Sequence, residues 1–177
     1  MPSFEIRPLT FSVETRDALA DLLVETVASG GSVSFMHPLS LDDARGFWEG
    51  LLKAADAGGR IVFGAYSGDE LLGTVTLVLA LPQNQPHRAE IAKMMTRVAA
   101  RGQGIATALL KRAEAEALAR GRSMLVLDTA SDGGAAGLYE RCGYIFAGEL
   151  PDYALKPHGG LTGTRLYWKK IAPHRVG

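Results

Sequence analysis

The sequence predicts an α+β fold with a mixed, mostly antiparallel central sheet flanked by helices. Two alternating apolar runs, 60–66 and 71–81, flank a tight polar connection that contains Gly68, which is typical of a β-hairpin. A strand, a long amphipathic helix and a continuous apolar strand follow within residues 90–127, and this succession indicates a parallel crossover. Because a hairpin and a crossover occur in the same chain, the expected sheet is mixed.

Before the hairpin, the sequence predicts one short strand and two helices. Residues 4–7 alternate between apolar and polar side chains, and Pro8 is expected to end this strand. Ser12 can cap a helix that continues to about Ala28, with its leucine and valine side chains toward one side. Ser40 opens a second helix with a start that is similar to a capping box.

After the hairpin, a cluster of Pro, Asn and Gln residues at 82–87 predicts a turn, and residues 90–96 are expected to return as a third antiparallel strand. The helix that follows carries a stripe of apolar residues spaced four apart from Ile105 onward, and Gly121 can end it. Residues 124–127 form a continuous apolar run, as expected for a strand that is covered on both faces.

The C-terminal part of the chain is expected to hold a short helix and two strands. Ser131 or Asp132 can cap the helix, which carries Tyr139 and ends at Gly143. The remaining expected elements are a strand that starts at 144–146, a loop that contains Pro151, and a last strand over 164–171.

The composition limits the class of protein. With 177 residues, the chain is long enough for one well-packed domain, expected over residues 1–177, and short for two. No apolar run approaches the roughly 20 residues of a membrane span and no secretory signal is visible, so we expect a cytoplasmic protein without a membrane partner. Lys+Arg and Asp+Glu both number 19, and this balance argues against a nucleic-acid partner.

Cysteine and histidine contribute little to the expected chemistry. Cys142 is the single cysteine, which excludes an intramolecular disulfide and a multi-cysteine metal site and favours a small core residue. The four histidines show no spacing with acidic residues that would form a ligand set, so no metal is expected.

The most informative segment is a glycine-containing turn between the strand at 90–96 and the long helix. Two glycines let the backbone approach a ligand, the free N–H groups of the helix start attract anions, and an arginine adds donors suited to phosphate. We interpret this segment as a pyrophosphate-binding turn. It is made by Arg101, Gly102, Gln103, Gly104, Ile105, Ala106 and Thr107.

Other interpretations of this turn are weaker or less specific. A P-loop needs G-x-x-x-x-G-K-[ST], which is absent from the chain. A dinucleotide-binding G-x-G-x-x-G fits Gly102 and Gly104, but Thr107 stands in place of the third glycine. The elements that precede the turn also do not alternate strand and helix, as a doubly wound fold would. An ordinary strand–turn–helix with glycine at the turn is the structural alternative.

Two motifs resemble those of one known family. Arg101, Gly104 and Ala106 match [RQ]-x-x-G-x-[GA] position for position, and residues 138–144 are similar to L-Y-x-x-x-G-[FY]. Together with the order of elements over nearly the whole chain, they resemble the GNAT superfamily of N-acetyltransferases. The resemblance implies a three-layer α/β GNAT fold, acetyl-CoA as co-substrate, and transfer to a primary amine by direct attack in a ternary complex. Because members of this family are often dimers, a homodimer is a further possibility that the resemblance raises.

The resemblance further implies roles for individual residues. Tyr139 matches the tyrosine that protonates the departing coenzyme A sulfur, with a packed aromatic residue as the alternative. Glu90 and Asp128 are the candidate bases, although Glu90 could equally be a solvated edge residue and Asp128 could cap a loop. The backbone expected to pair with pantetheine belongs to Met94, Met95 and Thr96, with Val98 as the other candidate for the strand end.

A finer resemblance concerns the acceptor. Residues 127–129 and 148–153 are similar to the tabtoxin resistance protein and its relatives, a GNAT subgroup that acetylates an amino-acid-like toxin. This similarity favours a small amine acceptor of amino-acid or antibiotic type. Phe35 and His37 lie in the loop where the family binds acceptors, so they are candidates for substrate binding. A protein N-terminus or lysine as acceptor, and a non-catalytic acyl-CoA-binding module, are the alternatives.

Overall fold

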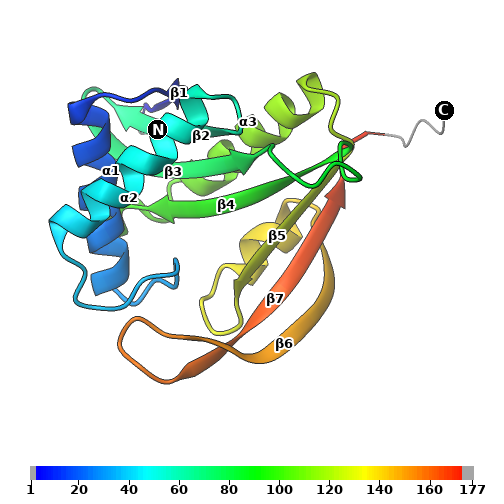
Figure 1. Cartoon of the computed structure of the whole chain (residues 1–177). Coiled ribbons are helices and arrows are strands. Elements are labelled where there is room, and N and C mark those ends of the chain that lie inside the picture. The colour runs from blue at the N-terminus through cyan, green and yellow to red at the C-terminus, as the bar shows by residue number, and fades with distance from the viewer. Residues whose placement is uncertain (1–2, 173–177) are drawn as a thin grey trace.

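One seven-stranded sheet runs through the computed structural model, which describes residues 3–172 (Figure 1). The strand order is β1-β2-β3-β4-β5-β7-β6, and every neighbouring pair is antiparallel except β4 and β5. The mixed, mostly antiparallel sheet confirms the fold class expected from the sequence. The strands are β1 (Glu5–Leu9), β2 (Arg60–Ser67), β3 (Glu70–Val78), β4 (Arg88–Thr96), β5 (Met124–Ala130), β6 (Ile145–Leu155) and β7 (Leu161–Lys170).

Helices cover both faces of this sheet. In the described part of the chain they are α1 (Val13–Ala28), α2 (Leu41–Asp56), α3 (Ile105–Ala119) and α4 (Ala136–Arg141). Helices α1 and α2 pack together on one face, and α3 lies on the opposite face (Figure 1). None of the helices in residues 3–172 combines the length and the apolar character needed to cross a membrane.

The starts of α1 and α2 and the end of α3 follow the predicted capping pattern. Ser12 Oγ accepts a hydrogen bond from the Thr15 N–H at 3.0 Å, and Ser40 Oγ accepts one from the Asp43 N–H at 3.1 Å. Gly121 follows α3 in a left-handed conformation with a φ of 74°, as expected for a residue that ends a helix. These local signals therefore fix the helix boundaries that frame the sheet.

Two clusters of buried side chains hold the three layers together. Between the sheet and the α1–α2 layer, Leu19, Leu23 and Trp48 are fully buried. On the opposite face, Phe63 of the sheet and Leu109 of α3 are fully buried in the cluster between the sheet and this helix. Burial of one such side chain stabilises the fold by about 1.5–3 kcal/mol relative to exposure. The packing therefore holds β4 and α3, which frame the site, in fixed positions.

The separation of β4 from β5 positions the site. Their parallel pairing consists of three residue pairs and ends at Glu90 opposite Val126. Beyond that point the two strands diverge (Figure 1). In the described part of the chain, the edge of β4 that faces β5 then has no strand partner. Its backbone N–H and C=O groups are therefore available to an extended ligand.

A β-bulge lies in this unpartnered part of β4. Thr74 pairs with Met95 and Thr76 pairs with Ala92, so two residues of β4 face a single residue of β3. One of the two is Lys93, whose φ of 50° is uncommon for a residue other than glycine. Bulges redirect side chains, and this bulge interrupts the regular alternation of β4 beside the diverging strands.

Three expectations about element boundaries were wrong. Pro8 does not end β1, because pairing continues to the next residue; β1 is an edge strand, which tolerates the missing N–H of proline. Strand β6 continues through Pro151, in a stretch where its pairing with β7 is interrupted. Helix α4 has Ala135 as its N-cap, so neither Ser131 nor Asp132 caps it.

Candidate active site

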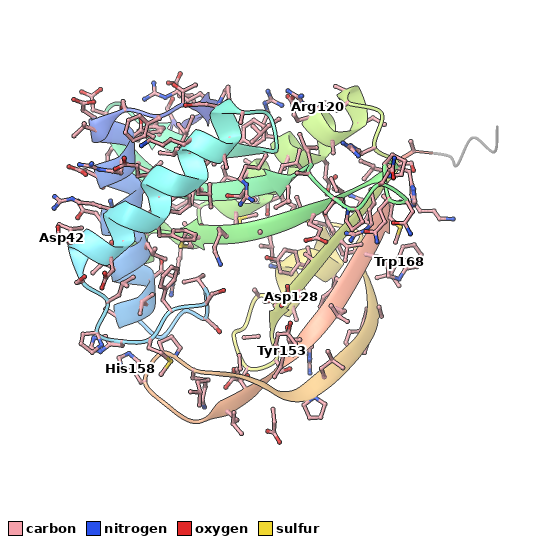
Figure 2. All side chains as sticks on the ribbon, in the orientation of Figure 1. Asp42, Arg120, Asp128, Tyr153, His158 and Trp168 are labelled. Carbon is pink, nitrogen blue, oxygen red and sulfur yellow. The ribbon has the colours of Figure 1, made fainter. Side chains whose placement is uncertain are left out.

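A cleft of about 1010 Å³ opens where β4 and β5 diverge. Its walls come from β4, β5, the turn between β4 and α3, the loop between α1 and α2, and the start of α4. Figure 2 shows Asp128 on β5 at a point where this strand has left β4. The cleft therefore joins the glycine-containing turn to the helix that carries Tyr139.

At one end of the cleft, the β4–α3 turn (residues 97–104) presents backbone groups to the open space. Gly102 and Gly104 have φ angles of 76° and 81°, which suit glycine and strain other residues. Gly104 is the N-cap of α3, and no side chain caps this helix start. The first N–H groups of α3 are therefore left for an anion, and Arg101 lines the cleft beside them.

Helix α1 fixes this turn from the opposite side. After β4 ends at Thr96, a 3₁₀ turn spans Val98–Ala100, so the strand end predicted at Thr96 is confirmed. Glu25 of α1 accepts hydrogen bonds from the Val98 N–H at 2.8 Å and from Arg97 Nη1 at 2.7 Å. Burial alone would raise the pKa of the Glu25 carboxyl, but these two hydrogen bonds, together with the positive charges of Arg97 and Arg101, lower its pKa.

The predicted cofactor-binding residues meet the cleft in different ways. Met94 and Thr96 line it from β4, and Met95 also lines it while its side chain is buried under α1 and α2. Gln103 is absent from the lining residues, because its amide turns back to a carbonyl of the 3₁₀ turn at 3.5 Å. The lining residues of the turn and the helix start are Arg101, Gly102, Gly104, Ile105, Ala106 and Thr107.

Tyr139 reaches the cleft from α4. Its ring is 5% exposed and packs edge-on against Tyr144, with the ring centroids 5.9 Å apart. Its phenol oxygen forms no hydrogen bond with another residue of the described chain and is available to a ligand. Burial first, and then the negative charge of Asp128, raise the pKa of Tyr139 to about 12. The phenol is therefore protonated at neutral pH, as a proton donor must be.

The two candidate bases lie in different surroundings. Asp128 Oδ2 accepts a hydrogen bond from Thr164 Oγ1 at 2.8 Å, and the carboxylate stays exposed to the cleft. Glu90 Oε1 forms an ion pair with Arg88 Nη1 at 2.6 Å, where β4 and β5 are still paired. Both carboxylates line the cleft, but Asp128 lies near enough to Tyr139 to raise the pKa of its phenol, and a neutral hydroxyl orients it. Its geometry is therefore the better suited to accepting a proton in the cleft.

Phe35 and His37, which were expected at the acceptor, do not line the cleft. Phe35 packs edge-on against Phe47 of α2, with the ring centroids 5.0 Å apart. His37 packs against His158 of the β6–β7 hairpin, with the ring centroids 4.4 Å apart. The loop lines the cleft through residues 29–34 instead. A substrate-binding role for Phe35 and His37 stays a prediction.

Four charged residues that the sequence analysis did not assign to the site also line the cleft: Lys93, Asp132, Arg141 and Lys156. Lys93 lines it from the bulge of β4, a feature that no motif in the sequence marks. Asp132 lines it from the loop after β5, accepts a hydrogen bond from Thr162 Oγ1 at 2.7 Å and pairs with Lys156 Nζ at 3.4 Å. The hydrogen bond from Thr162 is the main cause of the lowered pKa of Asp132. Asp132 lies two residues after the end of β5, and from the sequence it was considered only as a possible helix cap.

The sequence of the cleft-forming segments also matches a known family. Residues 30–144 match the model of the Acetyltransferase (GNAT) family. The chain belongs to this family. The match includes β4, the β4–α3 turn, β5 and Tyr139, so most of the GNAT cleft lies within it. The expected class of enzyme, an acetyltransferase, is confirmed, whereas membership of the tabtoxin resistance subgroup stays a prediction.

Solved structures of GNAT acetyltransferases share the fold over nearly the whole chain. An N-acetyltransferase from Staphylococcus aureus Mu50 has a TM-score of 0.80 at 21% identity, over 96% of this chain and 99% of its own. The structure of yncA from Salmonella typhimurium, solved with its cofactor acetyl-CoA, has a TM-score of 0.76 at 17% identity, over 98% of this chain and 96% of its own. An aminoglycoside 6'-N-acetyltransferase complexed with coenzyme A has a TM-score of 0.76 at 21% identity, over 97% of this chain and 99% of its own. At these identities the likeness shows the fold alone.

Proposed function

We propose that this protein is an acetyl-CoA-dependent N-acetyltransferase that acetylates the primary amine of a small molecule by direct attack in a ternary complex. One observation carries the proposal: a single cleft runs from the uncapped start of α3, along the unpartnered edge of β4, to Tyr139 and Asp128. An anion site, an edge for an extended ligand, and a proton donor beside a proton acceptor are what the reaction requires, in this order.

The residues of the cleft fit coenzyme A. The free N–H groups at the start of α3 and the donors of Arg101 suit the pyrophosphate. The free edge of β4 at residues 94–96 suits pantetheine, whose amides can pair with it as an added strand would. Two proteins of similar fold were solved with acetyl-CoA or coenzyme A, which supports the same co-substrate for this chain.

Acetyl transfer forms a C–N bond and breaks the C–S bond of the thioester. The amine must attack the carbonyl carbon in its neutral form, and Asp128 is suited to take its proton, directly or through a water molecule. A backbone N–H of residues 94–96 is suited to stabilise the negative charge that develops on the carbonyl oxygen. Tyr139 donates its proton to the departing sulfur, so that the proton lost by the amine is balanced by the proton gained by the thiol.

Release of the coenzyme A thiol from acetyl-CoA tests the proposal. The panel of amines consists of amino acids, dipeptides, polyamines and aminoglycosides, and turnover of one class supports the proposed reaction. Acetyl-CoA binding without turnover of any panel member would contradict the small-molecule acceptor and favour a protein N-terminus, a lysine, or a non-catalytic acyl-CoA-binding module. Calorimetric binding of NAD without binding of coenzyme A would contradict the co-substrate as well.

A further inference from the structure

Lys93 holds an unusual position at the acceptor end of the cleft, by which we mean the part lined by residues 29–34, Lys93, Asp128 and Tyr139. Its Nζ donates hydrogen bonds to the Val33 carbonyl at 3.1 Å and to Ser34 Oγ at 3.0 Å. Its backbone lies in the β4 bulge with a φ of 50°. Such strained conformations persist only where the surroundings enforce them, and they cluster at functional sites.

The ammonium of Lys93 forms no direct ion pair with a carboxylate in the described part of the chain. Among residues 3–172, no carboxylate lies within 4 Å of its Nζ; its two hydrogen-bond partners are neutral oxygens, and the ring of Phe47 lies 5.7 Å from it. The ammonium has three N–H donors, so one remains for a further partner. The other lysine that lines the cleft, Lys156, has an acidic partner in Asp132 at 3.4 Å. A half-buried cation with neutral partners is stabilised when an anion joins it.

The opposite charge is present on the facing strand. Asp128 of β5 lies near enough to Lys93 and Tyr139 for its carboxylate to act on the pKa of each. Burial lowers the pKa of Lys93, and the Asp128 charge opposes that effect. The acceptor end therefore presents a cation on β4 and an anion on β5. A small molecule with an ammonium and a carboxylate matches this pair, since its carboxylate meets Lys93 and its ammonium meets Asp128.

We propose that Lys93 is a specificity-determining residue that binds a carboxylate of the acceptor, and that the acceptor is therefore a small amine of amino-acid type. The inference rests on the proposed acetyl transfer and adds the class of amine. In this orientation the amine lies next to Asp128, the residue suited to take its proton. Polyamines and aminoglycosides carry several positive charges and no carboxylate, so Lys93 repels them.

Pairs of acceptors that differ only in the carboxylate test this role. Initial rates are measured with acetyl-CoA for glycine, β-alanine and γ-aminobutyrate, and for the carboxamide of each. We expect Lys93→Met to raise KM for the carboxylates by roughly 10- to 100-fold, the scale of a lost hydrogen bond to a charged group. The KM values of the carboxamides should change little. The ratio of the wild-type and Lys93→Met values is taken for each acceptor, so the intrinsic reactivity of the amine cancels.

Three variants separate charge from loop structure. Lys93→Arg keeps a cation and should keep most of the discrimination. Ser34→Ala removes one contact of the lysine with the loop and should affect carboxylates and carboxamides alike. Lys53→Met removes a lysine that pairs with Glu49 on the exposed side of α2, away from the cleft, and should change neither. Equal losses on both acceptor types in Lys93→Met would overturn the proposal and leave Lys93 with a role in holding the loop.

Calorimetry with acetyl-CoA distinguishes failure of this inference from failure of the proposed function. If acetyl-CoA binds to the wild type and to Lys93→Met with equal affinity, but the wild type acetylates only amines without a carboxylate, the role of Lys93 is overturned and the transfer reaction stands. If acetyl-CoA does not bind to the wild type, the proposed function fails, and the inference fails with it.

Discussion

The two ends of the cleft present different chemical groups: backbone groups at one end and side chains at the other. At the end formed by the β4–α3 turn, backbone N–H groups face the open space, and Gly102 and Gly104, with φ angles of 76° and 81°, set their direction. At the acceptor end the facing groups are the side chains of Lys93, Asp128 and Tyr139, which three different elements supply. The first end therefore depends on backbone conformation, and the second depends on single side-chain atoms. Substitutions at the two ends should consequently have different effects.

The largest effect is expected at the acceptor end, from Tyr139→Phe. Loss of the phenol O–H should lower kcat by roughly 10²–10⁴-fold, the scale of a general acid, while acetyl-CoA affinity changes little because the turn is intact. Steady-state kinetics and calorimetry measure the two quantities separately. Because the pKa of Tyr139 is raised to about 12, its ionisation should not lower wild-type kcat between about pH 8 and about pH 10. An unchanged kcat in the variant would assign Tyr139 to packing alone.

A matched pair of isosteric variants asks which acid serves as base. Asp128→Asn should lower kcat by about 10²-fold, near the lower bound for general-base catalysis, because the carboxylate next to the amine is then lost. Glu90→Gln should have a clearly smaller effect, since Glu90 is engaged by Arg88 at 2.6 Å. Rates at saturating acetyl-CoA measure both. A larger loss in Glu90→Gln than in Asp128→Asn would reverse the assignment of the base.

The β4–α3 turn could be predicted from the sequence because the residues that determine it are neighbours in the chain. Gly102, Gly104 and the uncapped start of α3 are near neighbours in the chain, and the left-handed conformations follow from what glycine permits. The order of strands and helices was also predictable, since periodicity and capping residues such as Ser12 and Ser40 act over a few residues. Pro151 misled because an edge strand tolerates a proline that a central strand would not.

The acceptor end could not be predicted because its geometry depends on contacts between distant parts of the chain. Lys93 owes its position to a β-bulge and to a bond with Val33, 60 residues away. Phe35 and His37 were expected in the cleft from their place in the loop. The rings of α2 and the β6–β7 hairpin instead hold these two side chains outside it. Sequence position identified a loop that lines the cleft, and tertiary packing decided which of its residues do so.

A smaller effect, on stability as well as on binding, is expected at the β4–α3 turn from Gly104→Ala. A Cβ at this position meets no atom within 4 Å, so the cost comes from the left-handed φ of 81° and should be about 1–2 kcal/mol of unfolding free energy. Acetyl-CoA affinity should fall with it. Gly50→Ala is the matched control: it also meets no atom within 4 Å, but it lies inside α2 and should stabilise by about 0.5–1 kcal/mol. Urea unfolding and calorimetry test both, and a stabilising Gly104→Ala would contradict the conformational argument.

The smallest effect is expected where α1 braces the turn, from Glu25→Gln. Glutamine can still accept from the Val98 N–H but loses the charge that faces Arg97 at 2.7 Å, so the free energy of unfolding at neutral pH should fall by about 1 kcal/mol. The pKa of Glu25 is lowered from its ordinary value of 4.5 in the folded state. Its charge therefore stabilises the fold above that value and ceases to do so as the pH falls through the folded pKa. Urea unfolding at about pH 7 and at about pH 3 should show the difference between wild type and variant shrinking on acidification. A difference that stays constant would assign the loss to hydrogen-bond geometry, and α1 would then hold the turn by shape and not by charge.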